Sequence, residues 1–246
     1  MTRLRLFRLR TAATIGLLLL LFAAVRLLWY PGGYFAVFGV GKLFLILATV
    51  MLVIGPGLSV FVFKAGKKGL TMDLWLLASV EFAAAVAAMS ILYVRQPYFT
   101  VFAVDRFEAV SWREVDVTQI GDPTLRRRPG HAPRLVYAEL PTDPEVFDRL
   151  IDETVFGGMQ DIDRRPEFWK PYSAGIPAVK AAAKPLDELL RGDDSRASRL
   201  ARWLSRQAGS SGDFVYLPVR GRGGDATMIL HAEVGFPVAI VDVDPW

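Results

Sequence analysis

Three long apolar stretches within the first 94 residues constrain this chain more than any other feature. They cover residues 11–29, 43–63 and 74–94. A helix needs about 20 apolar residues to cross the hydrocarbon core of a bilayer, and each stretch has that length. Arg26 and Glu81 are the only charged residues within them. We therefore expect residues 1–94 to form a membrane domain of three transmembrane α-helices.

The basic residues around these stretches predict their orientation. Loops rich in lysine and arginine stay in the cytoplasm. We expect a cytoplasmic N-terminus and, after three crossings, a C-terminal half on the outer side, which is the periplasm for a bacterial inner-membrane protein. The apolar run is too long for a cleaved signal peptide, which favours an uncleaved anchor. The basic residues in question are Arg3, Arg5, Arg8 and Arg10 before the first stretch and Lys64, Lys67 and Lys68 after the second.

The distribution of charge argues against binding to nucleic acid. The chain has 29 lysines and arginines and 25 acidic residues, a net charge of +4. The excess of positive charge lies in residues 1–94, whereas residues 95–246 hold 20 basic and 23 acidic residues. A nucleic-acid-binding domain needs a concentrated positive field that this second half lacks. The chain has no cysteine, so disulfides and thiolate metal sites are excluded.

Residues 95–246 are predicted to form a periplasmic α+β domain with an antiparallel sheet. A capping box of Thr142 and Glu145 should start a helix that ends at Gly157 and Gly158. Pro185 should break a second helical region, because proline lacks the amide donor. The expected strands cover residues 98–104, 134–140, 214–219, 227–233 and 237–243, and the further helices cover 176–191 and 196–208.

A search for catalytic motifs gives a negative result. His131 and His231 lack the spacing of a helical metal-binding pair, and no Gly-x-Ser-x-Gly motif is present. Residues 64–71 lack the glycine spacing of a phosphate-binding loop and follow a predicted membrane helix instead of a strand. We therefore predict no catalytic, cofactor-binding or metal-ligating residue and no cofactor, and interpret the chain as a protein that is not an enzyme.

Glu81 is the residue with the best claim to a function. An ionisable group inside a membrane helix usually faces a protein partner or a cavity, because lipid offers it no hydrogen bond. At helical spacing it shares a face with the small residues Ala84, Ala85 and Ala88, which allow another helix to approach closely. This face either binds a partner or packs against the first two predicted membrane helices of the same chain. The sequence leaves both possibilities open.

Four blocks of sequence have patterns specific enough to compare with a known protein family. They are residues 29–31, 55–73, 97–107 and 166–172, including the patterns GPxLxxxVFKxGKKxLxxD and VFxVDRF. With these blocks the chain resembles the TfpX/TfpZ (FimB-like) family of type IV pilin accessory proteins over nearly its whole length. The residues that carry the resemblance are Trp29, Pro31, Gly55, Pro56, Lys64, Gly66, Lys67, Lys68, Asp73, Asp105, Arg106, Phe107, Trp169, Pro171 and Tyr172.

The resemblance implies an inner-membrane protein that assists a cognate type IV pilin as a chaperone without catalysis. Its expected partners are the lipid bilayer and the major pilin. The resemblance does not assign the contact surfaces; our hypothesis is that the face of Glu81, Ala84 and Ala88 meets the pilin's membrane helix while the periplasmic domain contacts its head. The alternative is a membrane-anchored periplasmic enzyme or sensor with an unrecognised ligand pocket. The sequence also leaves open whether residues 30–42 lie on the membrane or fold under the periplasmic domain.

Overall fold

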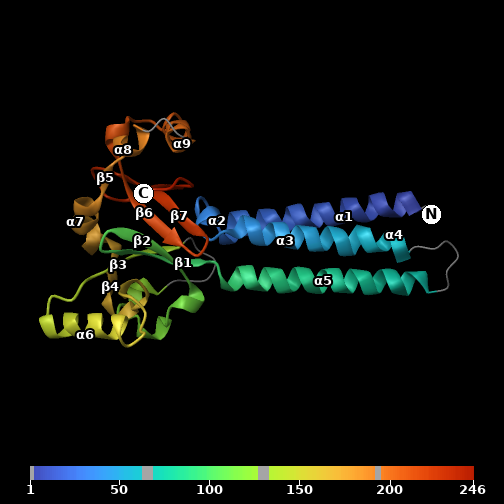
Figure 1. Cartoon of the computed structure of the whole chain (residues 1–246), viewed down its shortest axis with the longest axis horizontal. Coiled ribbons are helices and arrows are strands. Elements are labelled where there is room, and N and C mark those ends of the chain that lie inside the picture. The colour runs from blue at the N-terminus through green and yellow to red at the C-terminus, as the bar shows by residue number, and fades with distance from the viewer. Residues whose placement is uncertain (1–2, 63–68, 127–132, 192–194) are drawn as a thin grey trace. The chain divides into compact units, whose positions relative to one another are not determined.

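The computed structural model describes residues 3–62, 69–126, 133–191 and 195–246, which form two compact units (Figure 1). The helical unit comprises Met1–Trp29 and Val40–Val94. The sheet unit comprises Tyr30–Gly39 and Arg95–Trp246. The chain therefore passes between the two units three times, because the ten residues that link the first two long helices belong to the sheet unit.

The helical unit contains the three apolar helices that the sequence predicts. Helices long and apolar enough to cross a membrane cover Leu4–Trp29, Val40–Val62 and Leu70–Val94. The first consists of α1 (Arg3–Ala24) and the π-helical turn η1 (Val25–Trp29), and the third is α5 (Leu70–Val94). The second consists of α3 (Val40–Leu52), the π-helical turn η2 (Val53–Gly57) and α4 (Leu58–Val62). This composition associates the unit with a membrane.

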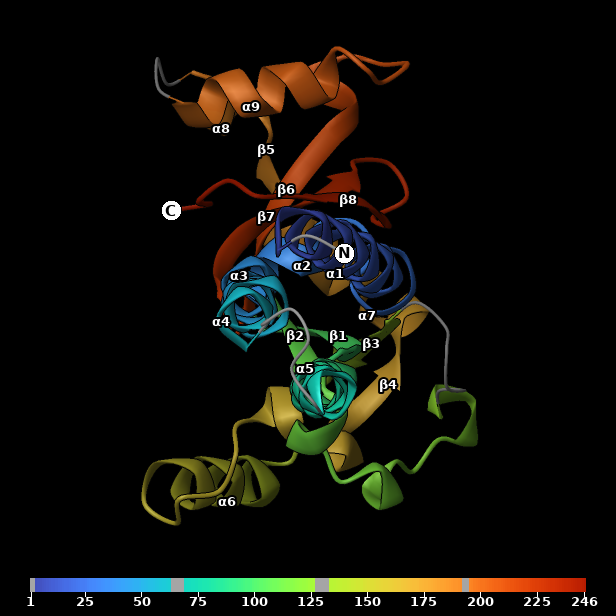
Figure 2. The ribbon, with the colours of Figure 1, turned by 90° about the vertical axis from the view of Figure 1, so that its right-hand side faces the viewer.

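The second helix of this unit changes its hydrogen-bonding pattern at a proline. Pro56 lies inside η2, where it removes one backbone donor from the helix. Figure 2 looks along the helices and shows α3 and α4 beside both α1 and α5. Leu18, Leu47, Met51 and Ala85 form the buried core between them.

The sheet unit is built on one mixed sheet of eight strands with the order β4-β3-β1-β2-β6-β7-β8, to which β5 adds beside β6. The β1–β3 and β2–β6 pairs are parallel, and the other pairs are antiparallel. The prediction of an antiparallel sheet is wrong in these two places. The strands are β1 (Pro97–Ala103), β2 (Arg106–Ser111), β3 (Arg134–Ala138), β4 (Trp169–Pro171), β5 (Lys184–Pro185), β6 (Phe214–Gly221), β7 (Gly224–His231) and β8 (Pro237–Val241).

The helices of the sheet unit begin and end close to the predicted positions, with three corrections. Asp143, not Thr142, caps the first helix, because its carboxylate accepts the backbone N–H groups of Glu145 and Val146. The second predicted helical region breaks at Pro185, but the break is a short strand that pairs with β6. The last helix ends at Leu204, before the expected stop. The helices are α2 (Tyr34–Val37), α6 (Pro144–Val155), α7 (Tyr172–Ala182), α8 (Asp187–Leu190) and α9 (Ser195–Leu204).

Short 3₁₀ turns complete the sheet unit. They are η3 (Trp112–Glu114), η4 (Val117–Gln119), η5 (Pro123–Leu125), η6 (Ile162–Arg164), η7 (Pro166–Phe168) and η8 (Ser211–Asp213). One buried cluster lies around β1 and β3, where Phe99 packs edge-on against Trp169 and Leu150 of α6 joins them. A second cluster holds α8 and α9 on β6 through Leu186, Leu200 and other apolar residues.

The segment 30–39 folds with the sheet unit, which answers the question that the sequence left open for most of residues 30–42. The backbone N–H of Gly223, in the β6–β7 turn, donates to the carbonyl of Val37 at 2.8 Å. The hydroxyls of Tyr34 and Thr100 share a hydrogen bond of 2.6 Å. Tyr30 and Val37 are almost completely buried. The segment is therefore part of the sheet unit, with Tyr30 and Phe38 buried and Tyr34 and Phe35 half-buried.

Candidate functional site

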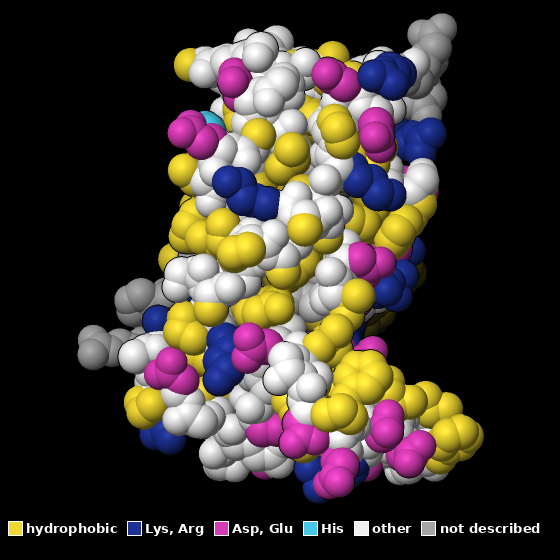
Figure 3. All heavy atoms as spheres, turned by 90° about the vertical axis from the view of Figure 1, so that its left-hand side faces the viewer, with side chains coloured by type: hydrophobic (Ala, Val, Ile, Leu, Met, Phe, Trp, Pro, Cys, Tyr) yellow, Lys and Arg dark blue, Asp and Glu magenta, His cyan; other side chains and the backbone are white. Residues whose placement is uncertain are grey.

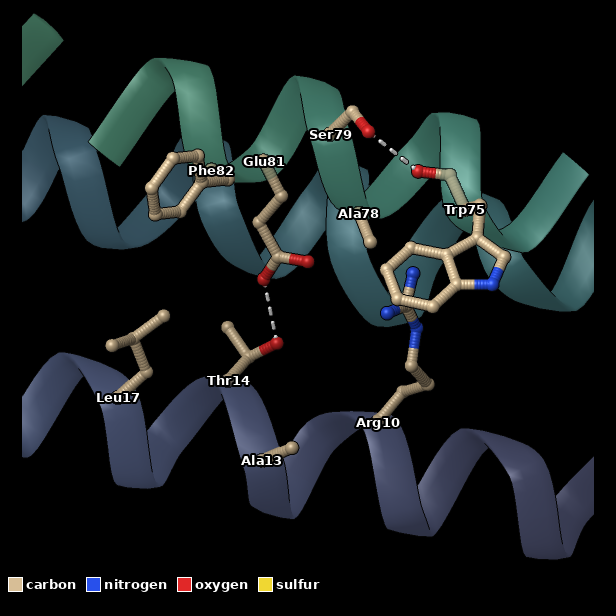
Figure 4. Close-up of a pocket in the computed structure, with 9 residues that line it drawn as sticks. All are labelled: Arg10, Ala13, Thr14, Leu17, Trp75, Ala78, Ser79, Glu81 and Phe82. Atoms are coloured by element: carbon tan, nitrogen blue, oxygen red, sulfur yellow. Dashed lines mark hydrogen bonds between the residues drawn. The ribbon is translucent and has the colours of Figure 1, made fainter. Parts of the chain in front are cut away.

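Glu81 lies inside the helical unit and is nearly buried, with 8% of its surface exposed. Thr14 of α1 donates a hydrogen bond of 2.8 Å from its hydroxyl to Oε1 of Glu81 (Figure 4). Gly55 of η2 lies against the other side of the carboxylate, and a Cβ added there would stand 2.6 Å from Oε1. Glu81 is thus held between two other segments of its own unit, and Gly55 gives it the necessary space.

The small-residue face around Glu81 is also directed into the helical unit. Ala85 belongs to the buried core, and Ala88 packs against that core. Ala84 is half-buried. In the structure this face therefore contacts other segments of its own helical unit, while Glu81 and Ala85 also line cavities on the surface of that unit. The hypothesis that Glu81, Ala84, Ala85 and Ala88 bind a partner stays a prediction.

Helix α5 also lines an open groove with α1, and Glu81 and Ala85 are among the residues that line it. One cavity of about 480 Å³ lies between the two helices, and a second of about 500 Å³ continues it and shares Leu17 and Phe82 with the first. We call the two together the α1–α5 groove. From Trp75 to Tyr93 it runs about 27 Å along α5 at the helical rise of 1.5 Å per residue. That length is close to the roughly 30 Å thickness of a bilayer's hydrocarbon core.

The two halves of the α1–α5 groove differ in polarity. Figure 4 shows the first half, where Arg10 and Thr14 of α1 point towards Trp75 and Glu81 of α5. The second half is lined almost entirely by apolar and aromatic side chains, and Trp29 packs edge-on against Tyr93 at its far end, with ring centroids 5.3 Å apart. The groove therefore combines an apolar channel with a few polar groups at one end.

Arg10 is the least satisfied of these polar groups. Its Nε donates a long hydrogen bond of 3.4 Å to the hydroxyl of Ser59. Its Nη2 is buried, and within the described ranges no hydrogen-bond acceptor reaches it. A buried guanidinium nitrogen without an acceptor is costly, so the polar end of the groove carries an uncompensated polar group.

The sheet unit carries a second candidate site, a polar pocket of about 280 Å³ at the β1–β2 turn and η6. Its charged lining residues are Arg106, Glu108, Asp161, Asp163, Arg164 and Arg220. Val104 stands at its rim with φ of 57°, a left-handed conformation that a β-branched residue rarely adopts. This pocket is not predictable from the sequence, because its residues come from three distant segments. The one local signal is the polar alternation of Arg106 and Glu108 along β2.

Arg164 is the centre of this acid–arginine pocket. It pairs with Asp163, and its other nitrogens lie 3.7 Å from Glu108 and 3.8 Å from Glu114. Burial, together with the neighbouring charge of Asp163, raises the pKa of Glu108 to about 7 against the opposing effect of Arg164. Burial likewise raises the pKa of Asp163 to about 6. These two carboxyl groups can therefore take up and release protons between about pH 6 and pH 7.

Glu114 also lies partly buried near Arg164, but its pKa is shifted in the opposite direction from that of Glu108. Burial acts on the pKa of Glu114 in the same upward direction, but two hydrogen bonds from Ser111, together with the positive charges of Arg222 and Arg164, outweigh it and lower that pKa. The backbone N–H of Ser111 donates at 2.8 Å and its hydroxyl at 2.6 Å. Glu108 has no comparable donor, because its contact with Arg164 is longer than a hydrogen bond. Among the described residues that line this pocket there is no serine, threonine, histidine or lysine.

The residues of the family-like blocks are mostly structural. Phe107, Trp169 and Tyr172 are buried, and the Tyr172 hydroxyl donates to the carbonyl of Gly235 at 2.6 Å. Asp105 and Arg106 pair at 3.0 Å beside the β1–β2 turn. The remaining placements are Pro31 in the docked segment, Gly55 and Pro56 in η2, Asp73 in the first turn of α5, and Pro171 before α7. Lys64, Gly66, Lys67, Lys68 and His131 lie outside the described residues.

Comparisons with known proteins do not identify the chain. No family model, curated protein or solved structure matches it. Within the part of the chain that the structure describes, no three histidine, cysteine or acidic side chains gather in a way that could hold a metal ion. The family resemblance therefore rests on the sequence blocks alone, and the sites rest on their geometry.

Proposed function

We propose that this chain is a bacterial inner-membrane accessory protein that holds the membrane helix of a cognate type IV pilin in the α1–α5 groove. In this role it acts as a chaperone for the pilin before or during pilus assembly and does not catalyse a reaction. The observation that carries the proposal is the groove itself, which is as long as a membrane-spanning helix and open between two helices of the unit.

The polar end of the groove favours a helix as occupant over lipid chains. Acyl chains fill apolar gaps between helices but cannot hydrogen bond to Arg10 or Glu81. A protein helix can present a polar side chain or an unpaired terminal backbone group at that depth. Ala13 and Ala78 line this end, and their small side chains allow a neighbouring helix to approach closely. The occupant that fits is an apolar helix with hydrogen-bonding groups near one end.

The orientation follows from the positive charge of the N-terminus. The four arginines at the start of α1 favour a cytoplasmic N-terminus, and in this orientation the polar end of the groove faces the cytoplasm and the sheet unit faces the periplasm. A membrane-anchored pilin has its own globular head on the same outer side. A three-helix unit with a groove and an outer domain is therefore a complementary arrangement for such a client.

Two valines on α5 provide a matched test. Val86 lines the groove and is 47% exposed, whereas Val80 does not line it and is 46% exposed. A photoreactive amino acid is placed at each position in turn, in membranes that also contain the major pilin of the same bacterium. We expect a pilin adduct from position 86 and little or none from position 80.

Each other outcome contradicts the proposal in a distinct way. Equal pilin adducts from both valines would mean that the pilin does not select the groove. Adducts only with lipid would make the groove a lipid site, and adducts with a second copy would make it a self-association surface. If neither position captures pilin, the acid–arginine pocket of the sheet unit becomes the better candidate, which corresponds to the alternative of a ligand-binding sensor or enzyme.

A further inference from the structure

Helix α6 carries an exposed apolar stripe that the fold does not use. Phe147, Ile151 and Val155 follow one another at intervals of four residues and therefore lie on one face of the helix. Phe156 and Met159 extend this face beyond the helix end, and all five side chains are exposed, Phe156 by 83%. We call these five residues the α6 stripe. In Figure 3 hydrophobic and acidic side chains lie side by side at the lower right, where α6 forms the surface.

The α6 stripe is separate from the face that holds the helix in place. Leu150 is 3% exposed and packs in the cluster around β1 and β3. Trp169 and Ile162 belong to the same cluster, so α6 is fixed to the sheet unit through its other side. A rigid helix with a contiguous apolar face exposed to water is typical of a protein interaction surface, because soluble domains seldom leave such patches uncovered.

The charges beside the stripe are acidic, and helix stability does not explain them all. Residues 143–156 contain five acidic residues and one arginine. Asp143 caps the helix, and Glu153 pairs with Arg165 at 2.8 Å. Asp148 and Asp152 have neither role, and like charges four residues apart repel each other. Asp152 also lies in the last turn, where the helix dipole disfavours negative charge.

This charge pattern selects one kind of occupant. Amphipathic helices that lie on membranes carry lysine and arginine beside the apolar face, whereas an acidic rim is repelled by anionic lipid. Two copies of α6 facing each other across a two-fold axis would bring their acidic rims together. A different protein with an apolar patch and a basic rim satisfies both the stripe and its charges.

We infer that the α6 stripe, with Asp148 and Asp152, is the surface that docks a basic-rimmed patch on the globular head of the client. The identity of the client rests on the proposed function, whereas the surface and the charge of its partner rest on α6 itself. The helical unit then holds the client's membrane helix and α6 holds its head, which gives two points of attachment on one chain.

The test uses the full-length chain in membranes with the major pilin of the same bacterium. A photoreactive amino acid replaces Val155 in the stripe or Val234 in the β7–β8 turn, which are 62% and 50% exposed. We expect a pilin adduct from position 155 and not from position 234. The double variant Asp148→Lys/Asp152→Lys should lower the yield at 155 roughly ten-fold at low salt. The control variant Glu188→Lys/Glu233→Lys reverses two exposed carboxylates elsewhere and so changes the net charge by the same amount. It should leave the yield of pilin adduct from position 155 unchanged.

The yield of pilin adduct from position 86 in the groove, measured in the same membranes, distinguishes a failure of this inference from a failure of the proposed function. Pilin adducts from 86 without any from 155 would overturn the role of α6 and leave the groove proposal standing. Adducts between two copies at 155 would overturn it in favour of self-association. Equal yields at 155 and 234, or insensitivity to the charge reversal, would show that α6 is not a specific surface. The absence of pilin adducts at both 86 and 155 would overturn the two proposals together.

Discussion

The raised pKa of Glu108 makes the stability of the sheet unit depend on pH. In the folded chain this carboxyl group has a pKa of about 7, compared with an ordinary value of 4.5. Between these values the folded state holds a proton that the unfolded state has released. The free energy of unfolding therefore falls as the pH rises from about 5 to 7 and changes little above that, since both states are then ionised.

The size of the effect follows from the two pKa values. Integrating the difference in bound protons from pH 5 to pH 8 gives a loss of roughly 2 kcal/mol from Glu108 alone. A change of that size moves the unfolding midpoint of a unit of this length by roughly 5 °C. Asp163, whose pKa is about 6, adds a loss of the same sign at slightly lower pH.

Glu108→Gln removes the proton exchange but keeps a polar side chain of the same shape. We expect the variant to be more stable than the native chain at pH 8, by roughly 3 kcal/mol, and to show a weaker dependence on pH. The Glu108→Gln/Asp163→Asn double variant should be nearly independent of pH in this range. Glu233→Gln changes an exposed carboxylate and serves as the control that keeps the native dependence.

Thermal unfolding of the full chain in nanodiscs, followed by tryptophan fluorescence from pH 5 to pH 8, measures this dependence. Replacing Trp29 and Trp75 by phenylalanine leaves four tryptophans, all within the sheet unit. A native midpoint that is constant over this range, or one that rises with pH, would refute the reasoning. So would a Glu108→Gln variant with the same slope as the native chain.

Three further predictions address the groove and the packing of both units. Ala78→Leu should fill the polar end of the α1–α5 groove and reduce the pilin adduct from position 86 roughly ten-fold, whereas Ala87→Leu, exposed outside the groove, should not. Gly55→Ala should displace the Glu81 carboxylate and cost about 1–3 kcal/mol of unfolding free energy in bicelles, and Glu81→Ala in the same chain should recover part of that loss. Gly223→Ala would place a Cβ 2.6 Å from Gly39 Cα and should lower the thermal midpoint and expose residues 30–39 to protease, whereas Gly212→Ala, with its nearest neighbour at 3.8 Å, should do neither.

The sequence predicted the features of this chain that depend on local patterns. The three apolar helices, the strands 214–219 and 227–233 and the break at Pro185 are each encoded within a short window of residues. The parallel pairs β1–β3 and β2–β6 were missed, since parallel strands join distant segments and have no turn signal between them. The shift of the cap from Thr142 to Asp143 shows the ordinary uncertainty of one residue at a helix end.

The sites depended even more on distant contacts. Glu81 was singled out from the sequence because a carboxylate within an apolar helix is costly, but its partner Thr14 is 67 residues away. Gly55 gave no sign that it makes room for that carboxylate. Glu108 and Asp163 attracted no attention as ordinary acidic residues, because only the fold brings both of them to Arg164 and removes them from water.

The docked segment 30–39 also sets an order of events during synthesis. Chains emerge from the ribosome N-terminus first, so Tyr30 and Val37 appear long before the β6–β7 hairpin that receives this segment. By then both ends of the segment are tied to long apolar helices. The sheet unit therefore folds around residues 30–39 after the helices at both ends of this segment have become part of the helical unit. A fragment that starts at residue 95 would lack residues 30–39 and leave the apolar surface that they cover open to water, so studies of the isolated sheet unit should include this segment.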